Sequence, residues 1–179
     1  MKNPSYLPLL LVAIGLAVHA DESPVDVGER IHVDVGEVVA TGEAVPVDGI
    51  TSSGQPDEAA LRVFANAGYV AIIDMRGPDE DRGLDDERAV VQALGLDYVP
   101  FPITGRDEIN FDTAKELDGL LRGIDGPVLL HCGSGNRVGA MLALRQSLHG
   151  ADDDAAIAYG KDAGLTRLEP LVRERLDDK

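Results

Sequence analysis

The sequence predicts an α/β fold: a central, mostly parallel sheet flanked by helices. Apolar segments of strand length alternate along the chain with longer segments of helical periodicity. Two of the apolar segments, residues 69–75 and 128–131, are almost continuously hydrophobic, which is typical of strands covered on both faces. Strands that alternate with helices favour a parallel sheet, because a helix provides the crossover between neighbouring parallel strands.

Local signals place the individual elements. Proline followed by acidic residues is typical of a first helical turn, and glycine is typical of the residue that ends a helix. Asparagine or aspartate before a helix accepts hydrogen bonds from its free N–H groups. These signals predict a helix from Pro56 to Gly68, a strand over 69–75, a helix over 87–94, a strand over 97–101, a helix from Asn110 or Asp112 to Gly123, a strand over 128–131, a helix to about His149, and further helices beginning near Asp152 and Leu168.

Residues 1–20 have the layout of a secretory signal. Lys2 provides a cationic start, residues 7–18 are apolar, and Ala20 is a small residue at the expected cleavage point. The apolar stretch is shorter than the roughly 20 residues that span a bilayer. We therefore expect cleavage near Ala20, a periplasmic or secreted mature protein and no stable membrane insertion. An uncleaved N-terminal anchor is the alternative.

The remaining chain divides into an acidic segment and one globular domain. Residues 25–29 recur as residues 33–37, with apolar and acidic positions alternating and a glycine in each copy. This pattern predicts short strands, a hairpin or a loosely ordered linker over residues 21–48. Residues 49–179 are long enough to form the domain with the main hydrophobic core.

The chain is strongly acidic. Its 16 Lys and Arg against 32 Asp and Glu give a formal charge of −16, which makes nucleic acid and anionic membranes poor partners. The acidic runs at 79–81, 85–87 and 152–154 are predicted to be solvated faces or helix starts. No histidine lies at a metal-ligand interval from another, so we expect neither a metal nor another cofactor. The histidines are His19, His32, His131 and His149.

Residues 131–137 are the segment that suggests a chemistry. Cys132 stands where a buried strand turns into a helix, and free N–H groups and the helix dipole there favour a thiolate. Gly133 and Gly135 let the backbone curl so that N–H groups point inward, and the planar Arg137 fork suits an oxyanion. A lone cysteine is often only a small core residue. An arginine at a helix N-terminus, however, is better explained by a bound anion, so we expect a small anionic or phosphorylated substrate.

This loop and several other segments resemble the cysteine-dependent phosphatases of the dual-specificity and tyrosine-phosphatase-like superfamily. The resemblance is stronger to a bacterial branch, the beta-lactamase-hydrolase-like phosphatase-like domain family. It covers about residues 49–176 and implies a tyrosine-phosphatase-like fold. Only the cysteine loop among the matching segments is specific to chemistry. The segments are residues 53–56, 73–76, 98–103, 127–137, 158–160 and 163–165.

The resemblance implies a role for each residue of the loop. Cys132 would attack phosphorus and carry a phosphocysteine, and Arg137 would bind the phosphoryl oxygens. An acid that protonates the leaving group would fall in the loop after residue 102, where Asp107 is the first choice and Glu108 the second. His131 would either tune the thiolate or only fill the strand end. The backbone N–H groups of Gly133, Ser134, Gly135 and Asn136 would surround the bound phosphoryl group; we call these four residues the cradle.

Two departures from the superfamily pattern open an alternative. Four residues separate Cys132 from Arg137, where most tyrosine phosphatases have five, and Val138 stands where a hydroxyl residue is common. Four-residue spacing also resembles that of single-domain sulfurtransferases of the rhodanese type, which would carry a persulfide on Cys132. A third hypothesis is a catalytically weak domain that binds an oxyanion or serves in protein interaction.

The rhodanese resemblance extends weakly to another segment. Asp74 and Arg76, with Glu80, echo an aspartate-x-arginine strand of that family. The chain lacks the Gly-His-Ile segment that would precede the active loop, and residues 150–179 have helical periodicity where a closing strand is expected. We therefore expect Asp74 and Arg76 to form a structural pair at the end of their strand.

Overall fold

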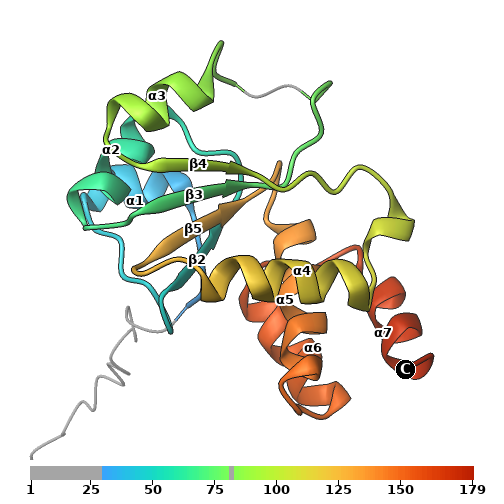
Figure 1. Ribbon diagram of the computed structural model, residues 1–179. Coiled ribbons are helices and arrows are strands. Elements are labelled where there is room, and N and C mark those ends of the chain that lie inside the picture. Colours follow the sequence, from blue (N-terminus) through green and yellow to red (C-terminus); the bar gives the residue numbers. More distant parts are fainter. Residues whose placement is uncertain (1–29, 81–82) are drawn as a thin grey trace, which may run out of the picture.

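The computed structural model describes residues 30–80 and 83–179 (Figure 1). The predicted signal segment and the first part of the acidic segment lie outside the described residues. A five-stranded sheet forms the centre, and every neighbouring pair of its strands is parallel. Its order is β1-β2-β5-β3-β4, with β1 at His32–Val33, β2 at Ile50–Ser53, β3 at Ala71–Asp74, β4 at Asp97–Pro100 and β5 at Val128–His131.

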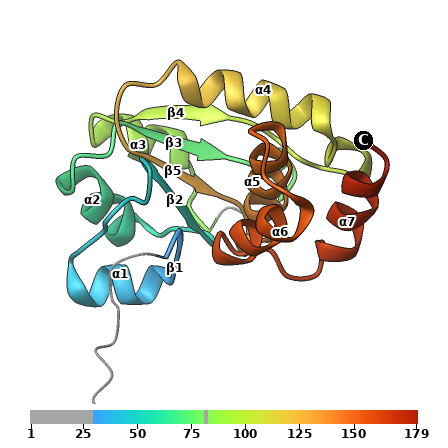
Figure 2. The same cartoon turned by 90° about the horizontal axis from the view of Figure 1, so that it is seen from below.

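Helices cover both faces of the sheet, as the sequence predicts (Figures 1 and 2). None of the described helices is long and apolar enough to span a membrane. One face carries α1 at Val35–Thr41, α2 at Glu58–Asn66 and α3 at Glu87–Ala93. The other carries α4 at Phe111–Arg122, α5 at Asn136–Leu148, α6 at Asp153–Asp162 and α7 at Glu169–Asp177, and the 3₁₀ helix η1 at Arg106–Glu108 precedes α4.

Side chains that alternate along the central strands build two hydrophobic cores. Ile73 and Leu130 pack in the core under α4 to α7, whereas Ile72 and Leu129 pack in the core under α1 to α3. Successive residues of a strand point to opposite faces of the sheet. Because both faces of these strands are covered, their sequences are continuously apolar.

Short polar side chains begin the helices at or near the predicted points. The exception is α2, which begins at Glu58 after the cap Asp57, so Pro56 precedes the helix instead of opening it. Asp57, Asn110 and Asp152 each accept a hydrogen bond from a backbone N–H in the first turn of the helix that follows. These bonds satisfy N–H groups that have no partner within the helix. The acidic run at 152–154 is therefore a helix start, as expected.

The acidic segment before residue 49 differs from its prediction. The repeat at 33–37 does not form a strand or hairpin, because Val35–Thr41 is the helix α1 and Asp34 caps it. His32–Val33 is a short strand, as the pattern allows, and it pairs with β2 at Ser52 and Ser53. A cap residue followed by a helix-length segment explains the difference, since period-two alternation over five residues cannot exclude a helical turn. This segment thus adds a strand to the same sheet.

Candidate active site

Cys132 lies at the carboxyl end of the central strand β5. That strand pairs with β2 on one side and with β3 on the other, so the ends of three strands surround the thiol. The backbone N–H of Met75, just after β3, donates to the carbonyl of His131 (2.9 Å). Ligand sites of parallel α/β sheets lie at this edge. The predicted position of the cysteine loop is thus the observed one.

A left-handed glycine turns the loop into helix α5. Gly135 is the residue before α5 and has φ +77°, a conformation that side chains disfavour. Ser134 forms an isolated bridge with Gly54, which follows β2, and so ties the loop to the neighbouring strand end. The first N–H groups of α5 are left without helical partners. The local structure therefore has the form of an anion-binding turn.

His32, on the edge strand β1, supports the back of this turn. A Cβ built on Gly135 would lie 2.3 Å from Cε1 of His32, and one built on Gly164 would lie 2.8 Å from its Nδ1. The His32 Nδ1 is 3.2 Å from Oγ of Ser52, whose hydroxyl donates to the carbonyl of Ala163 (2.7 Å). Burial lowers the pKa of His32, although Asp34 and Asp162 act in the opposite direction. The loop and the α6–α7 connection thus share one imidazole as their packing partner.

Arg137, on α5, contacts the segments that follow two strands, β3 and β4. Its Nη1 donates to the carbonyls of Met75 (3.3 Å) and Ile103 (3.0 Å), which follow β3 and β4. Both of its terminal nitrogens bind Glu80, at 2.5 Å for Nη1–Oε1 and 2.6 Å for Nη2–Oε2. These bonds with Glu80 lower the pKa of that carboxyl. The guanidinium is thus oriented before any substrate arrives, and a carboxylate occupies its fork.

The thiol of Cys132 lies beside this guanidinium and is 1% exposed. The hydrogen bonds to Glu80 raise the pKa of Arg137 against the effect of burial, and the adjacent sulfur adds to the rise. Cys132 also contacts the core under α4 to α7. The sulfur is therefore packed between the guanidinium and the hydrophobic core and is not accessible to solvent in the described structure.

A pocket of about 410 Å³ opens next to Arg137; we call it the side pocket. Aliphatic side chains form part of its wall, and its charged lining residues are Glu80, Arg106 and Arg137. Such a volume is at the lower end of that of pockets for small molecules. The remaining lining residues are Ile103, Thr104, Gly105, Ile109 and Leu168.

The two candidate acids lie next to each other on η1, but only one has bonding partners. The Glu108 carboxylate accepts hydrogen bonds from the N–H of Gly105 (2.8 Å) and from the N–H and hydroxyl of Thr104. Hydrogen bonds from the Gly105 and Thr104 amides lower its pKa. Asp107 is exposed and does not line the side pocket, whereas its neighbour Arg106 does.

The four cradle residues do not share one environment. Gly133 and Ser134 are exposed, whereas Gly135 and Asn136 are buried. The Asn136 side chain accepts hydrogen bonds from the N–H groups of Thr166 (2.8 Å) and Leu168 (3.3 Å). Asn136 therefore fixes the α6–α7 connection with its side chain, which leaves only its backbone for a ligand.

His131 belongs to a buried charged cluster behind the thiol. Arg76 binds Asp74 through Nε (2.8 Å) and Nη2 (2.9 Å), and it also binds Glu87. Tyr98 donates to Asp74 (2.6 Å). Burial alone raises the pKa of Asp74, but the bonds from Arg76 and Tyr98 and the charge of His131 hold it well below its usual range. The predicted pairing of Asp74 with Arg76 is confirmed.

The spacing of this cluster would suit a metal ion, but its charge is already balanced. Ligand atoms of Asp74, Glu87 and His131 lie within 4.8 Å of one another. Nε2 of His131 is 2.9 Å from Oε1 of Glu87, without hydrogen-bond geometry. The buried Arg76 guanidinium lies against both carboxylates, and a divalent cation there would meet that positive charge. The donor set therefore fits an internal ion-pair network better than a metal centre.

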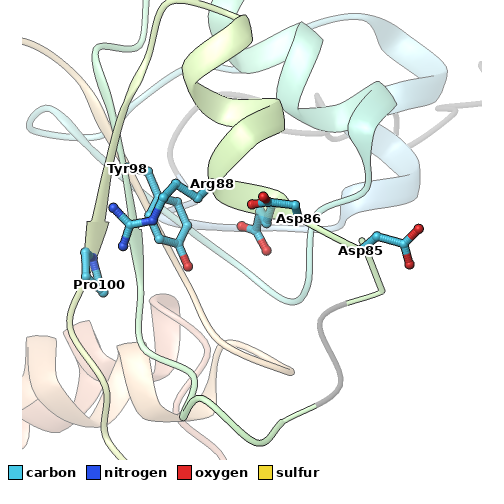
Figure 3. A pocket seen from close by; sticks show the side chains of 6 residues that line it. Asp85, Asp86, Arg88, Tyr98 and Pro100 are labelled. Carbon is cyan, nitrogen blue, oxygen red and sulfur yellow. The ribbon is translucent and has the colours of Figure 1, made fainter.

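A second hollow, of about 240 Å³, lies between α3 and β4 (Figure 3). The guanidinium of Arg88 lies over the ring of Tyr98, 4.9 Å from its centre. Neither Cys132 nor Arg137 lines this hollow, so it is separate from the thiol. Its lining residues are Asp85, Asp86, Glu87, Arg88, Tyr98 and Pro100.

Sequence reasoning missed three contributions to the site. The run at 85–87 is a helix start, as predicted, because Asp86 caps α3 and Glu87 lies in its first turn. The bonds of Glu87 to Arg76 and of Glu80 to Arg137 were not predicted. His32 carried no signal in the sequence, because its contact with the loop joins residues far apart in the chain. A single acidic residue inside an acidic run looks the same whether it is solvated or paired. Only the folded arrangement distinguishes the two cases.

The chain is similar in sequence to a family of known proteins. The profile of the family described as "Beta-lactamase hydrolase-like protein, phosphatase-like domain" matches residues 46–149. The beta-lactamase hydrolase-like protein of Xylella fastidiosa strain 9a5c is 34% identical over 130 residues, which are 65% of this chain and 29% of that protein. The chain thus spans less than a third of the length of that curated relative.

Solved structures share the fold. One from Neisseria meningitidis, provisionally described as a phosphatase, is 27% identical with a TM-score of 0.61, over 71% of this chain and 90% of that one. A mutant form of Tk-PTP is 17% identical with a TM-score of 0.53, over 71% of this chain and 89% of that one. These neighbours are tyrosine-phosphatase-like and confirm the predicted fold class.

Proposed function

Because the chain belongs to the family of the beta-lactamase hydrolase-like protein, phosphatase-like domain, we propose that it is a cysteine-dependent phosphatase that acts through a phosphocysteine on Cys132. One observation carries the proposal. The sulfur lies at the carboxyl end of the central strand, beside a guanidinium that backbone carbonyls and a carboxylate hold in place. A nucleophile next to an oriented oxyanion donor is what phosphoryl transfer requires.

In the proposed reaction the Cys132 thiolate attacks phosphorus, so that an S–P bond forms as the P–O bond to the leaving group breaks. The N–H groups of the loop and the Arg137 fork stabilise the charge on the equatorial oxygens. Water then attacks phosphorus, the S–P bond breaks, and phosphate leaves with the thiolate restored. Val138 is buried and brings no hydroxyl to this second step, so we expect it to be the slower one.

Asp107 is our proposed general acid. The carboxylates of Glu80 and Glu108 are held by hydrogen bonds from Arg137 and from the Thr104 and Gly105 N–H groups, so their oxygens are already occupied. The Asp107 carboxyl forms no hydrogen bond or ion pair among the described residues, and it adjoins Arg106 at the side pocket. Substrate binding would have to bring the leaving oxygen within reach of this carboxyl.

The pairing of Arg137 with Glu80 sets a condition on substrate binding. Glu80 holds both terminal nitrogens of Arg137, so phosphoryl oxygens reach the fork only when they share it with Glu80 or displace it. We therefore expect Glu80 to move when an anion binds.

The test combines turnover with mass analysis of the trapped protein. Wild type and Cys132→Ser are exposed briefly to phenyl phosphate and, separately, to thiosulfate, and acid-quenched samples are weighed intact. The proposal expects a phosphoryl adduct and phosphate release in wild type and neither in Cys132→Ser. Phosphate release that persists in Cys132→Ser contradicts it. A sulfur adduct from thiosulfate without phosphatase activity supports a sulfurtransferase instead.

A further inference from the structure

We propose that Arg106 is a second anion-binding point in the side pocket, and that the preferred substrates are phosphate monoesters with a further anionic group on a small apolar leaving group. This inference rests on the proposed phosphatase function and adds a substrate class to it. The cysteine loop by itself does not specify a leaving group, whereas the side pocket lies where the leaving group would extend.

Substrate binding would leave an excess of negative charge around the thiol, which a second cation would reduce. As long as Glu80 occupies the fork, it neutralises Arg137, and the proposed mechanism adds the negative charge of the Cys132 thiolate. A phosphate monoester brings up to two further negative charges into this site, within a chain whose formal charge is −16. Each unbalanced like charge weakens binding in a partly enclosed pocket. A cation besides Arg137 would offset that repulsion.

Arg106 is the cation that the side pocket offers. It lines the pocket together with Arg137, and its guanidinium forms no ion pair or hydrogen bond among residues 30–80 and 83–179. Arg173 and Arg175, by contrast, pair with carboxylates on their own helix. An unpaired arginine at a pocket wall in so acidic a chain has its planar fork available for a ligand anion.

Hydrogen bonds within the turn that carries Arg106 fix its backbone. The Glu108 carboxylate binds the N–H groups of Thr104 and Gly105 from the far side of the turn, and Asn110 donates to the carbonyl of Asp107 (2.7 Å). These bonds fix the backbone on both sides of Arg106. The guanidinium therefore extends from an ordered turn.

The geometry also limits the size of the leaving group. The carbonyl of Ile103 accepts a hydrogen bond from Arg137, and Arg106 follows three residues later, a chain span of at most about 10 Å. The aliphatic side chains of Ile103, Ile109 and Leu168 line the same pocket. A single aromatic ring or a short aliphatic chain with a terminal carboxylate matches this combination of apolar wall and cation.

The experiment measures binding without turnover. In the Cys132→Ser background, calorimetry gives the Kd of phenyl phosphate and of 4-carboxyphenyl phosphate, which differ only in the second anionic group. Arg106→Gln removes the charge and Arg106→Lys keeps it. Arg62→Gln is the matched control, because Arg62 is an exposed arginine on α2 whose partner is Glu58. Thermal melting of each variant reports folding separately.

We expect the carboxylated compound to bind at least about fivefold more tightly than phenyl phosphate, a gain typical of one charge-assisted contact. Arg106→Gln abolishes this gain and Arg106→Lys retains part of it, while Arg62→Gln leaves it intact. The gain also shrinks as salt is added, because a partly exposed ion pair is screened. An equal gain in Arg106→Gln and Arg62→Gln overturns the proposal.

Because these measurements use a variant that cannot turn over, they also separate the two proposals. An absence of phosphatase activity in wild type overturns the proposed reaction while the Kd ratio still reports on Arg106. An intact phosphatase whose Kd ratio ignores Arg106 overturns only the subsite. Binding of neither compound to Cys132→Ser overturns the subsite as well.

Discussion

The imidazole of His32 occupies the space where a side chain on Gly135 would be. A Cβ at Gly135 would lie 2.3 Å from Cε1 and 2.6 Å from Nδ1 of His32. Gly135 begins the helix that carries Arg137, and His32 belongs to the strand that precedes the family-matched region. The N-terminal strand therefore contributes directly to the shape of the cysteine loop.

Gly135→Ala tests this contact. We expect a loss of unfolding free energy of about 3 kcal/mol, from the left-handed backbone and from overlap with the His32 ring. Gly95→Ala is the control, because Gly95 has nearly the same φ, +79°, with nothing within 4 Å of its Cβ position. It should lose only about 1–2 kcal/mol in urea unfolding. Adding His32→Ala should restore part of the difference, and equal losses at both glycines would show that the ring imposes no constraint.

His32 should also make stability depend on pH. Its pKa in the folded state is lowered by burial, so the folded protein binds a proton less readily than the unfolded chain does. Its contribution is therefore complete above the unfolded pKa of 6.5 and is lost as the pH falls through the lower folded value. We expect the melting temperature to fall between pH 7 and pH 5 by more in wild type than in His32→Gln. Parallel pH profiles of the two proteins contradict this.

Glu80→Gln should change anion affinity rather than stability. The amide keeps the shape of the carboxylate but removes the charge that competes with a phosphoryl group for Arg137. We expect inorganic phosphate to bind about tenfold more tightly, equivalent to ~1.4 kcal/mol, with the Kd measured by calorimetry. Glu58→Gln, on the exposed face of α2, is the control and should leave the Kd unchanged. Weaker phosphate binding in Glu80→Gln would mean that Glu80 chiefly positions the guanidinium.

The buried cluster behind the thiol should be essential for folding. Arg76→Met leaves the carboxylates of Asp74 and Glu87 buried without their main cation, which costs about 3–5 kcal/mol. Arg62→Met breaks only an exposed pair on α2 and should cost less than about 1 kcal/mol. Urea unfolding of the two variants measures both values. Similar losses would show that the Arg76 cluster contributes no more than a surface ion pair.

The regular elements could be predicted because their signals are local. The apolar runs at Ala71–Asp74 and Val128–His131, and the helix starts at Asn110 and Asp152, act over a few residues and are visible in the sequence. The segment at Val35–Thr41 was mispredicted because its repeat is too short to separate a period of two from a helical turn. Length, rather than composition, limited the prediction there.

The features of the candidate site also divide into those with a local sequence signal and those that depend on the fold. The order of residues 131–137 alone placed a thiol and a guanidinium at a strand-to-helix junction, because a buried strand, two glycines and a helix follow one another directly in the chain. The partners of that loop come from distant segments: Glu80 after β3, His32 on β1 and Arg106 after β4. The sequence by itself thus determined which groups can react and which strand carries them. Only the tertiary structure decided that the Glu80 carboxylate binds Arg137, that the Cys132 sulfur is buried and that the unpaired Arg106 lies beside the side pocket. These features depend on the order of strands in the sheet and on charges that folding brings together.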